Sequence, residues 1–179
     1  MRSSLKLTMV ERLRALRQDP TASVRTMGVS EGLKVADIGA GIGYFTVPAA
    51  LVVGPAGLVY SVEPDAVRSA RISKRVAAEG LQNVQVLTTG AEQLGAIATG
   101  SLDVAFSAFS FHHFSDRQAA LAELRRVLHA DGSFYVWDRV PGLLVRHGTR
   151  RDELGGLAEG FARFEPLGAG KTVRARFTK

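Results

Sequence analysis

The residues best suited to chemistry form one short segment, 37–43, with the sequence Asp-Ile-Gly-Ala-Gly-Ile-Gly. The apolar run 33–38 leads into it and predicts a buried strand, and 44–53 after it predicts a helix. Glycines between a strand and a helix let the backbone approach a ligand closely. A nicotinamide or flavin site requires Gly-x-Gly-x-x-Gly, but in either register the third glycine position holds Tyr44 or Thr46. A carboxylate beside the loop favours a cation and would repel a phosphate, so a nicotinamide oxidoreductase is disfavoured.

A second carboxylate, Glu63, ends the next predicted strand, 58–62. It lies 20 residues beyond Gly43, at a place where an acidic side chain can accept hydrogen bonds from both hydroxyls of a ribose. This position fits several nucleoside ligands and does not by itself choose between them.

The order Asp-x-Gly-x-Gly-x-Gly resembles the first motif of class I S-adenosylmethionine-dependent methyltransferases, whose cofactor carries a sulfonium and an ammonium group. Segment 89–94, Thr-Gly-Ala-Glu-Gln-Leu, is similar to the family's Gly-Asp-Ala-Glu-x-Leu, and 107–114 is similar to its segment ending in His-His-Phe. The resemblance covers residues 33–140. It implies S-adenosylmethionine as cofactor and S-adenosylhomocysteine as product. Within the family, the pattern is closest to the small-molecule branch that includes quinone-ring C-methyltransferases.

The same resemblance implies a role for individual residues. Glu63 would bind the ribose, Pro64 would turn the chain under the adenine, and Ser107 would line the methionine end. Gly90 stands where the family has the aspartate that binds the adenine amino group, so Glu92 or a backbone carbonyl would take over that contact. The implied cofactor-binding residues are Asp37, Gly39, Ala40, Gly41, Gly43, Glu63, Pro64, Gly90, Ala91, Glu92 and Ser107.

The neighbouring histidines His112 and His113 belong to the segment that the resemblance places near the transfer site. His113 is a candidate catalytic base, and local packing or hydrogen bonding is the alternative for both residues. Adjacent side chains point apart and no further ligands stand nearby, so no metal site is predicted. Trp137 and Asp138, at the end of the fifth predicted strand, are candidates for the same rim.

Positive charge is concentrated in two segments. Residues 1–36 hold seven basic and three acidic groups, and residues 139–179 hold nine and four, whereas 37–138 hold seven and ten. The basic segments either border a site for an anionic partner, which could be a small molecule or RNA, or form solvated helix faces. Three arginines could bind such an anion, namely Arg146, Arg150 and Arg151. The alternative is that they begin an exposed helix.

Strands and helices alternate along the chain. Ser115 and Gln118 predict a capping box for one helix, which Asp131 and Gly132 would end. Strands are expected at 33–38, 58–62, 84–87, 102–106, 133–137, 161–167 and 172–177, and helices at 44–53, 65–79, 115–128 and 152–158. Alternation of this kind predicts an α/β fold with a doubly wound, mostly parallel seven-stranded sheet. The three-residue loop 168–170 can join only antiparallel neighbours, which places one antiparallel strand near the edge.

The chain of 179 residues is expected to form one methyltransferase domain, 1–179. It would comprise an N-terminal helical segment (1–28), a cofactor-binding core (33–140), and a final helix and strand pair (141–179). Apolar residues at helical spacing predict an amphipathic helix over the ligand-binding rim; these are Leu5, Val10, Leu13 and Leu16.

The chain contains no cysteine, which excludes disulfides and thiolate chemistry. No apolar run is long enough to span a membrane, and no signal-peptide core is present, so a cytoplasmic protein is expected. The function predicted is methyl transfer from S-adenosylmethionine to a small-molecule acceptor by in-line displacement. The alternatives are an RNA methyltransferase that uses the basic segments and a non-catalytic S-adenosylmethionine-binding protein.

Overall fold

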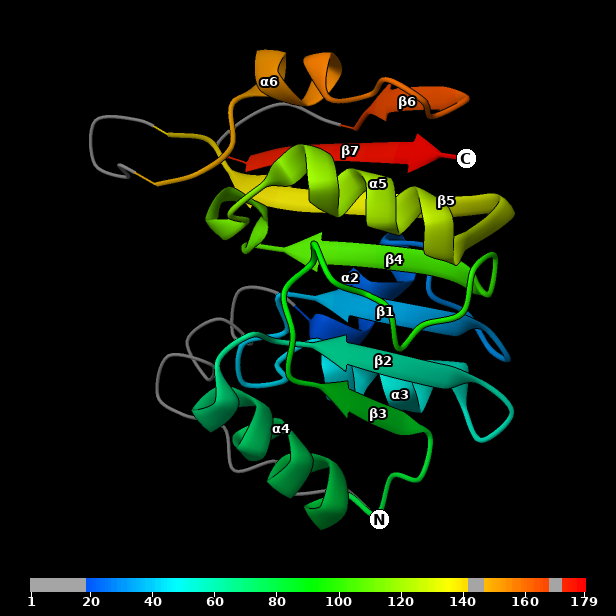
Figure 1. Ribbon diagram of the computed structural model, residues 1–179. Coiled ribbons are helices and arrows are strands. Elements are labelled where there is room, and N and C mark those ends of the chain that lie inside the picture. Colours follow the sequence, from blue (N-terminus) through cyan, green and yellow to red (C-terminus); the bar gives the residue numbers. More distant parts are fainter. Residues whose placement is uncertain (1–18, 142–146, 168–171) are drawn as a thin grey trace.

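The computed structural model describes residues 19–141, 147–167 and 172–179 (Figure 1). Seven strands form one sheet in the order β3-β2-β1-β4-β5-β7-β6. Their bounds are β1 (Lys34–Ile38), β2 (Leu58–Val62), β3 (Val84–Leu87), β4 (Leu102–Ala108), β5 (Leu128–Arg139), β6 (Arg163–Pro166) and β7 (Thr172–Thr178). Strand β7 is antiparallel to β5 and β6, and the other paired strands are parallel. The expected doubly wound sheet with one antiparallel strand near its edge is therefore confirmed.

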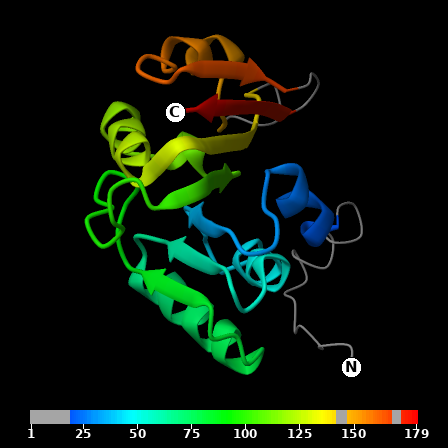
Figure 2. The same ribbon diagram turned by 90° about the vertical axis from the view of Figure 1, so that its right-hand side faces the viewer.

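Helices cover both faces of the sheet (Figure 2). Three pack on one face, α2 (Pro20–Thr26), α3 (Thr46–Val53) and α4 (Ala66–Ala78), and the other face carries α5 (Arg117–Val127), α6 (Arg151–Gly156) and a 3-10 helix, η1 (Phe111–His113). The strands supply both cores by alternation: Val35 packs with the α3 side, and Ala36 with the α5 side. Across the described segments, no helix is both long and apolar enough to cross a lipid bilayer.

Helix α3 follows the glycine segment and is buried on nearly every side. Among its residues only Leu51 is exposed, because α2 packs over its outer face. A helix held between a sheet and a second helix has little freedom to move. The loop that leads into α3 is therefore set firmly against the ends of β1 and β4.

The predicted boundaries around α5 were wrong in two respects. The N-cap is Asp116 and not Ser115, because the Asp116 carboxylate accepts the amide of Ala119 at 2.9 Å. Gly132 does not end a helix, because α5 stops at Val127 and β5 begins at Leu128.

Strand β5 starts earlier than expected because its first residue already pairs with β4, at Leu102. Gly132 lies so close to β4 that a Cβ on it would come within 2.9 Å of the Leu102 carbonyl oxygen. The helix predicted around residues 5–16 and the loop 168–170 lie outside the described residues.

Candidate functional site

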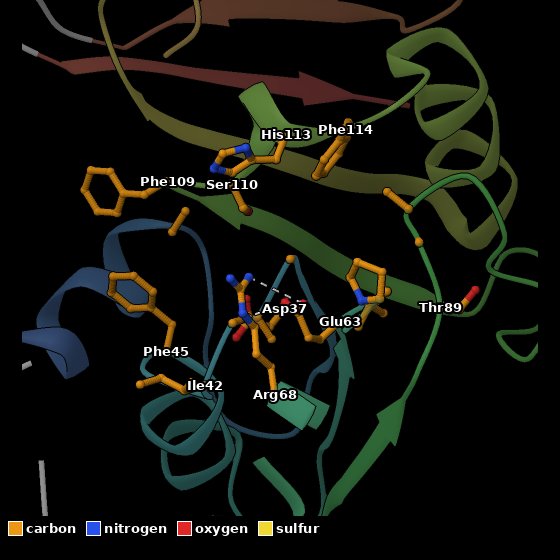
Figure 3. Close-up of a pocket in the computed structure, with 18 of the residues that line it drawn as sticks. Asp37, Ile42, Phe45, Glu63, Arg68, Thr89, Phe109, Ser110, His113 and Phe114 are labelled. Atoms are coloured by element: carbon orange, nitrogen blue, oxygen red, sulfur yellow. Dashed lines mark hydrogen bonds and ion pairs between the residues drawn. The ribbon is translucent and has the colours of Figure 1, made fainter. Parts of the chain in front are cut away.

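A cavity of about 780 Å³ opens at the carboxyl ends of β1, β2 and β4 (Figure 3). Its walls are the glycine loop after β1, Glu63 after β2, residues 89–92 after β3, and residues 108–110 and 113–115 after β4. The chain reverses the direction of strand order between β1 and β4. Open α/β sheets bind their ligands at this kind of switch point.

The backbone amides at the start of the glycine loop are already used inside the protein. Gly39 and Ala40 donate to the carbonyl of Val62, at 2.8 and 3.0 Å, and Gly41 donates to the Glu63 carboxylate at 2.8 Å. A phosphate needs a cluster of open amides, which this part of the loop does not offer. The carboxylates of Asp37 and Glu63 instead place negative charge beside the loop.

Gly39 is the point of closest approach between the loop and β4. Its φ is +74°, and a Cβ on it would lie 2.5 Å from Ser110 Oγ. The Ser110 hydroxyl donates to the carbonyl of Ile38 at 2.9 Å and lies 2.7 Å from the Ser107 hydroxyl. These contacts hold the end of β4 against the loop and form the floor of the cavity.

Asp37 is a buried carboxylate with little compensation. Only 2% of the residue is exposed, and the hydroxyl of Thr46 donates to it at 2.7 Å. Burial raises the pKa of Asp37 to about 7; the Thr46 hydrogen bond opposes this rise, and the negative charge of Glu63 adds to it. A cation beside Asp37 would stabilise its charged form.

Glu63 is held in place by the two segments that flank it. One carboxylate oxygen accepts the amide of Gly41, and the other accepts that of Asp65 at 3.1 Å and lies 3.8 Å from the Arg68 guanidinium. Asp65 in turn caps α4. The orientation of Glu63 is therefore fixed before a ligand arrives, and each oxygen keeps a lone pair for a further donor.

Gly90 and Glu92 line the same end of the cavity. A Cβ on Gly90 would lie 2.6 Å from Glu92 Oε2, so the Glu92 carboxylate fills the space that a side chain at position 90 would need. The other oxygen of Glu92 accepts the amide of Asp116 at 3.1 Å. This end carries negative charge although position 90 has no side chain.

The opposite end of the cavity is aromatic. Figure 3 places Phe45 and Phe109 on the side away from Thr89, with Asp37 and Glu63 between the two ends. The rings of Phe45 and Phe109 are 6.5 Å apart with 25° between their planes.

Phe109 has a φ of 60°, and among the described residues no other amino acid except glycine has a positive φ. A bulky residue in this region is strained, and such strain is typical of functional sites. The amide of Phe109 donates to the carbonyl of Trp137 at 2.6 Å, and the two rings are 5.1 Å apart. The position of the Phe109 ring is therefore set by β5.

Residues 36–136 match the methyltransferase domain family. The match covers more than half of the chain. The chain belongs to the methyltransferase domain family. It is therefore an enzyme, and its cofactor is S-adenosylmethionine, as the sequence predicts. No curated protein sequence matches the chain.

Solved structures resemble this methyltransferase over most of its length. A SAM-dependent methyltransferase from Aquifex aeolicus has 25% identity and a TM-score of 0.80 over 92% of each chain. One from Thermotoga maritima, described as a possible histamine N-methyltransferase, has 23% identity and a TM-score of 0.70 over 96% of this chain and 92% of that one. An arsenic(III) methyltransferase from Chlamydomonas reinhardtii has 22% identity and a TM-score of 0.69, over 84% of this chain and 63% of that one.

The polar groups that line the cavity of the methyltransferase fit its cofactor. S-adenosylmethionine combines a sulfonium and an ammonium group with an adenosine, and its amino and hydroxyl groups donate hydrogen bonds. The cavity offers the carboxylates of Asp37, Glu63 and Glu92. The buried Asp37 carboxylate has one hydroxyl donor and no cationic partner among the described residues, so a cationic ligand supplies what it lacks.

The structure brings together most of the residues predicted to bind the cofactor. Nine line the cavity, namely Asp37, Gly39, Ala40, Gly41, Glu63, Pro64, Gly90, Ala91 and Glu92. Gly43 instead packs against Ile72, and Ser107 lies behind Ser110, so neither lines the cavity.

The predicted arginine site for an anion is not assembled at the cavity. Arg150 pairs with Asp152 at 2.9 Å, and Arg151 donates to the carbonyl of Thr172. Neither lines the cavity, and Arg146 lies outside the described residues.

Sequence reasoning missed Ile42, Tyr44, Phe45 and Arg68 as lining residues. Proximity to the glycine motif could have identified Ile42, Tyr44 and Phe45. Arg68 offered no such signal, because its side chain reaches the cavity from α4.

Proposed function

We propose that the protein transfers the methyl group of S-adenosylmethionine to a small, largely apolar molecule by in-line displacement. The polarity of the cavity supports this proposal most directly. The carboxylates of Asp37 and Glu63 lie between the end formed by residues 89–92, which include Glu92, and the end walled by Phe45 and Phe109. A cationic cofactor suits the part that holds the carboxylates, and an apolar acceptor suits the aromatic end.

Each carboxylate would meet a different part of the cofactor. Asp37 would lie near its positive charges, Glu63 would accept hydrogen bonds from the ribose hydroxyls, and Glu92 would accept one from the adenine amino group. All three are held by amide or hydroxyl donors of the protein. Binding would therefore require little rearrangement at this end.

The aromatic end would align the acceptor and keep water out. The cofactor supplies a methyl group that its sulfonium charge has already activated, so positioning is the main task left to the protein. The strained Phe109 backbone and its contacts with Trp137 fix one wall, and Phe45 from the glycine loop fixes the other.

RNA is the less favoured acceptor because several basic groups are already paired within the protein. Arg163 pairs with Glu165 at 2.7 Å, Arg117 pairs with Glu153, and Arg150 pairs with Asp152. RNA affinity would fall steeply with salt, so a salt series distinguishes the two acceptors.

A labelling experiment tests the acceptor class. The protein is incubated with S-adenosylmethionine bearing a trideuterated methyl group and a cell extract divided into low-molecular-mass and RNA fractions. Mass spectrometry should find the label in a low-molecular-mass product, and the Asp37→Ala variant should form none. Label confined to RNA, or label in neither fraction, would overturn the proposal.

A further inference from the structure

A second buried carboxylate, Asp138, stands at the end of β5 outside the cofactor-binding set. It is completely buried and accepts four hydrogen bonds. The donors are the backbone and ring nitrogens of His112, at 3.0 and 2.9 Å, the amide of Arg139 at 2.8 Å, and the hydroxyl of Thr149 at 2.7 Å. A carboxylate held so completely fixes the three segments that meet at it.

The ring of His112 is hydrogen-bonded to this carboxylate through Nδ1. Its side chain is only 10% exposed, and the contact with Asp138 assigns the Nδ1 proton to that bond. Contrary to the expectation that adjacent side chains point apart, the ring of His112 lies against that of His113, with 3.9 Å between the ring centroids. Asp138 therefore positions His113 through His112.

His113 is the one histidine that lines the cavity within the described residues. Figure 3 shows its ring above the cavity, near Ser110 and on the aromatic side of Glu63. Partial burial lowers the pKa of His113, and the neighbouring His112, His147 and Arg68 lower it further, whereas Asp138 raises it. At neutral pH its ring is therefore uncharged and can accept a proton.

We propose that His113 accepts the proton that the acceptor loses during methyl transfer, and that Asp138, acting through His112, holds its ring in place. The acceptor's X–H bond breaks and its proton passes to a ring nitrogen of His113. The electron pair left on X forms the bond to the methyl carbon, and the carbon–sulfur pair stays on sulfur. The protonated ring then releases its proton to water.

This assignment rests on the proposed function and explains two features that a structural anchor alone would not require. The backbone and Nδ1 bonds of His112 would suffice to hold η1 against β5. They do not account for a second imidazole, His113, that lies against the first at an interplanar angle of 43° and is turned to the cavity.

Histidine titration by NMR tests the placement without a known acceptor. The His113 ring resonance is assigned with the His113→Gln variant and titrated in complexes with S-adenosylmethionine and S-adenosylhomocysteine. The sulfonium charge beside the ring should make the pKa of His113 lower with S-adenosylmethionine by roughly one unit. The control is the ring resonance of His129, which contacts Asp103 and does not line the cavity; its chemical shift should be the same in both complexes.

The two possible failures give different results. Equal values of the His113 pKa in two saturated complexes would overturn the role of His113 but leave the cofactor site intact. Failure of both ligands to bind would instead contradict the proposed function. The pKa values compared are those of the wild-type protein, and the His113→Gln variant serves only to assign the resonance.

Two variants then test the positioning residues. His112→Gln removes a group that lowers the pKa of His113 and should raise it, whereas Asp138→Asn removes a group that raises it and should lower it. Opposite shifts in the pKa of His113 are not expected from a general loosening of η1.

With the labelled low-molecular-mass acceptor, His113→Gln should slow transfer roughly 100-fold with little change in S-adenosylmethionine affinity. An unchanged rate would contradict the proposal.

Discussion

The carboxylate of Glu92 occupies the space beside Gly90, where a Cβ would lie only 2.6 Å from Glu92 Oε2. The chain thus places a negative charge next to position 90 although that residue has no side chain. The second oxygen of Glu92 is tied to the amide of Asp116, which joins this end of the cavity to the start of α5.

Glu92→Ala should weaken S-adenosylmethionine binding roughly 10- to 150-fold, because a hydrogen bond to a charged group contributes roughly 1.5–3 kcal/mol. Gln93→Ala, which changes the exposed neighbour, is the matched control and should leave the affinity unchanged. Calorimetry measures both. Adding Gly90→Asp to Glu92→Ala should recover affinity, and a double variant as weak as Glu92→Ala would contradict the placement of Glu92.

Gly39→Ala should be more damaging than Gly41→Ala. Both glycines have a positive φ, +74° and +62°, but only at Gly39 does a Cβ meet Ser110, since nothing lies within 4 Å of one on Gly41. Backbone strain of about 1 kcal/mol is common to both variants, and the collision at Gly39 adds to it. Chemical unfolding should show the larger loss for Gly39→Ala, and Ser110→Gly should restore part of it. Equal losses in the two single variants would be inconsistent with this packing.

Asp37→Asn should stabilise the ligand-free protein at pH 8. Folding raises the pKa of Asp37 from 3.8 to about 7, so the folded state keeps a proton that the unfolded chain releases between these values. The free energy of unfolding therefore falls as pH rises through this window, by up to about 1.4 kcal/mol per unit. Thermal melts should show the variant above wild type at pH 8 and level with it at pH 4. A variant that melts below wild type at pH 8 would argue against a strained carboxylate.

Phe109→Gly should fold more stably than Phe109→Ala by about 1 kcal/mol, because glycine adopts a positive φ without cost. The φ of Phe109 is 60°, whereas that of Phe114 is −63°, so at Phe114 the alanine variant should be the more stable one. Urea unfolding of the four variants measures both differences. The same order at both positions would mean that the strain at Phe109 is absent.

The sequence predicted those parts of the site that are local in the chain. Each of these parts directly follows a strand: the glycine loop, the turn after Glu63 and the segment at Gly90. The carboxyl ends of parallel strands share one edge of the sheet, so these parts were expected to lie together. The mostly parallel sheet with one antiparallel strand near its edge followed from the alternation of elements and the short last loop. These inferences required no knowledge of side-chain packing.

The aromatic end could not be predicted in the same way. Phe45 and Phe109 are far apart in sequence, and their rings meet only because β1 and β4 are neighbours. The contact of Asp138 with His112 likewise depends on how η1 folds back onto β5. The cap at Asp116 was missed because serine and aspartate are about equally good N-caps, and the packing of the chain decides between them.

We infer that the buried carboxylate of Asp37 binds the positive charge of the cofactor. Calorimetric titration with S-adenosylmethionine at pH 5.5 and pH 7.5, on the wild type and Asp37→Asn, tests it most directly. Because each unit below the pKa reduces the ionised fraction about tenfold, wild-type affinity should be at least about tenfold higher at pH 7.5. The variant should bind weakly at both values. Affinity that does not change with pH, or a variant that binds as tightly as the wild type at pH 7.5, would contradict the claim.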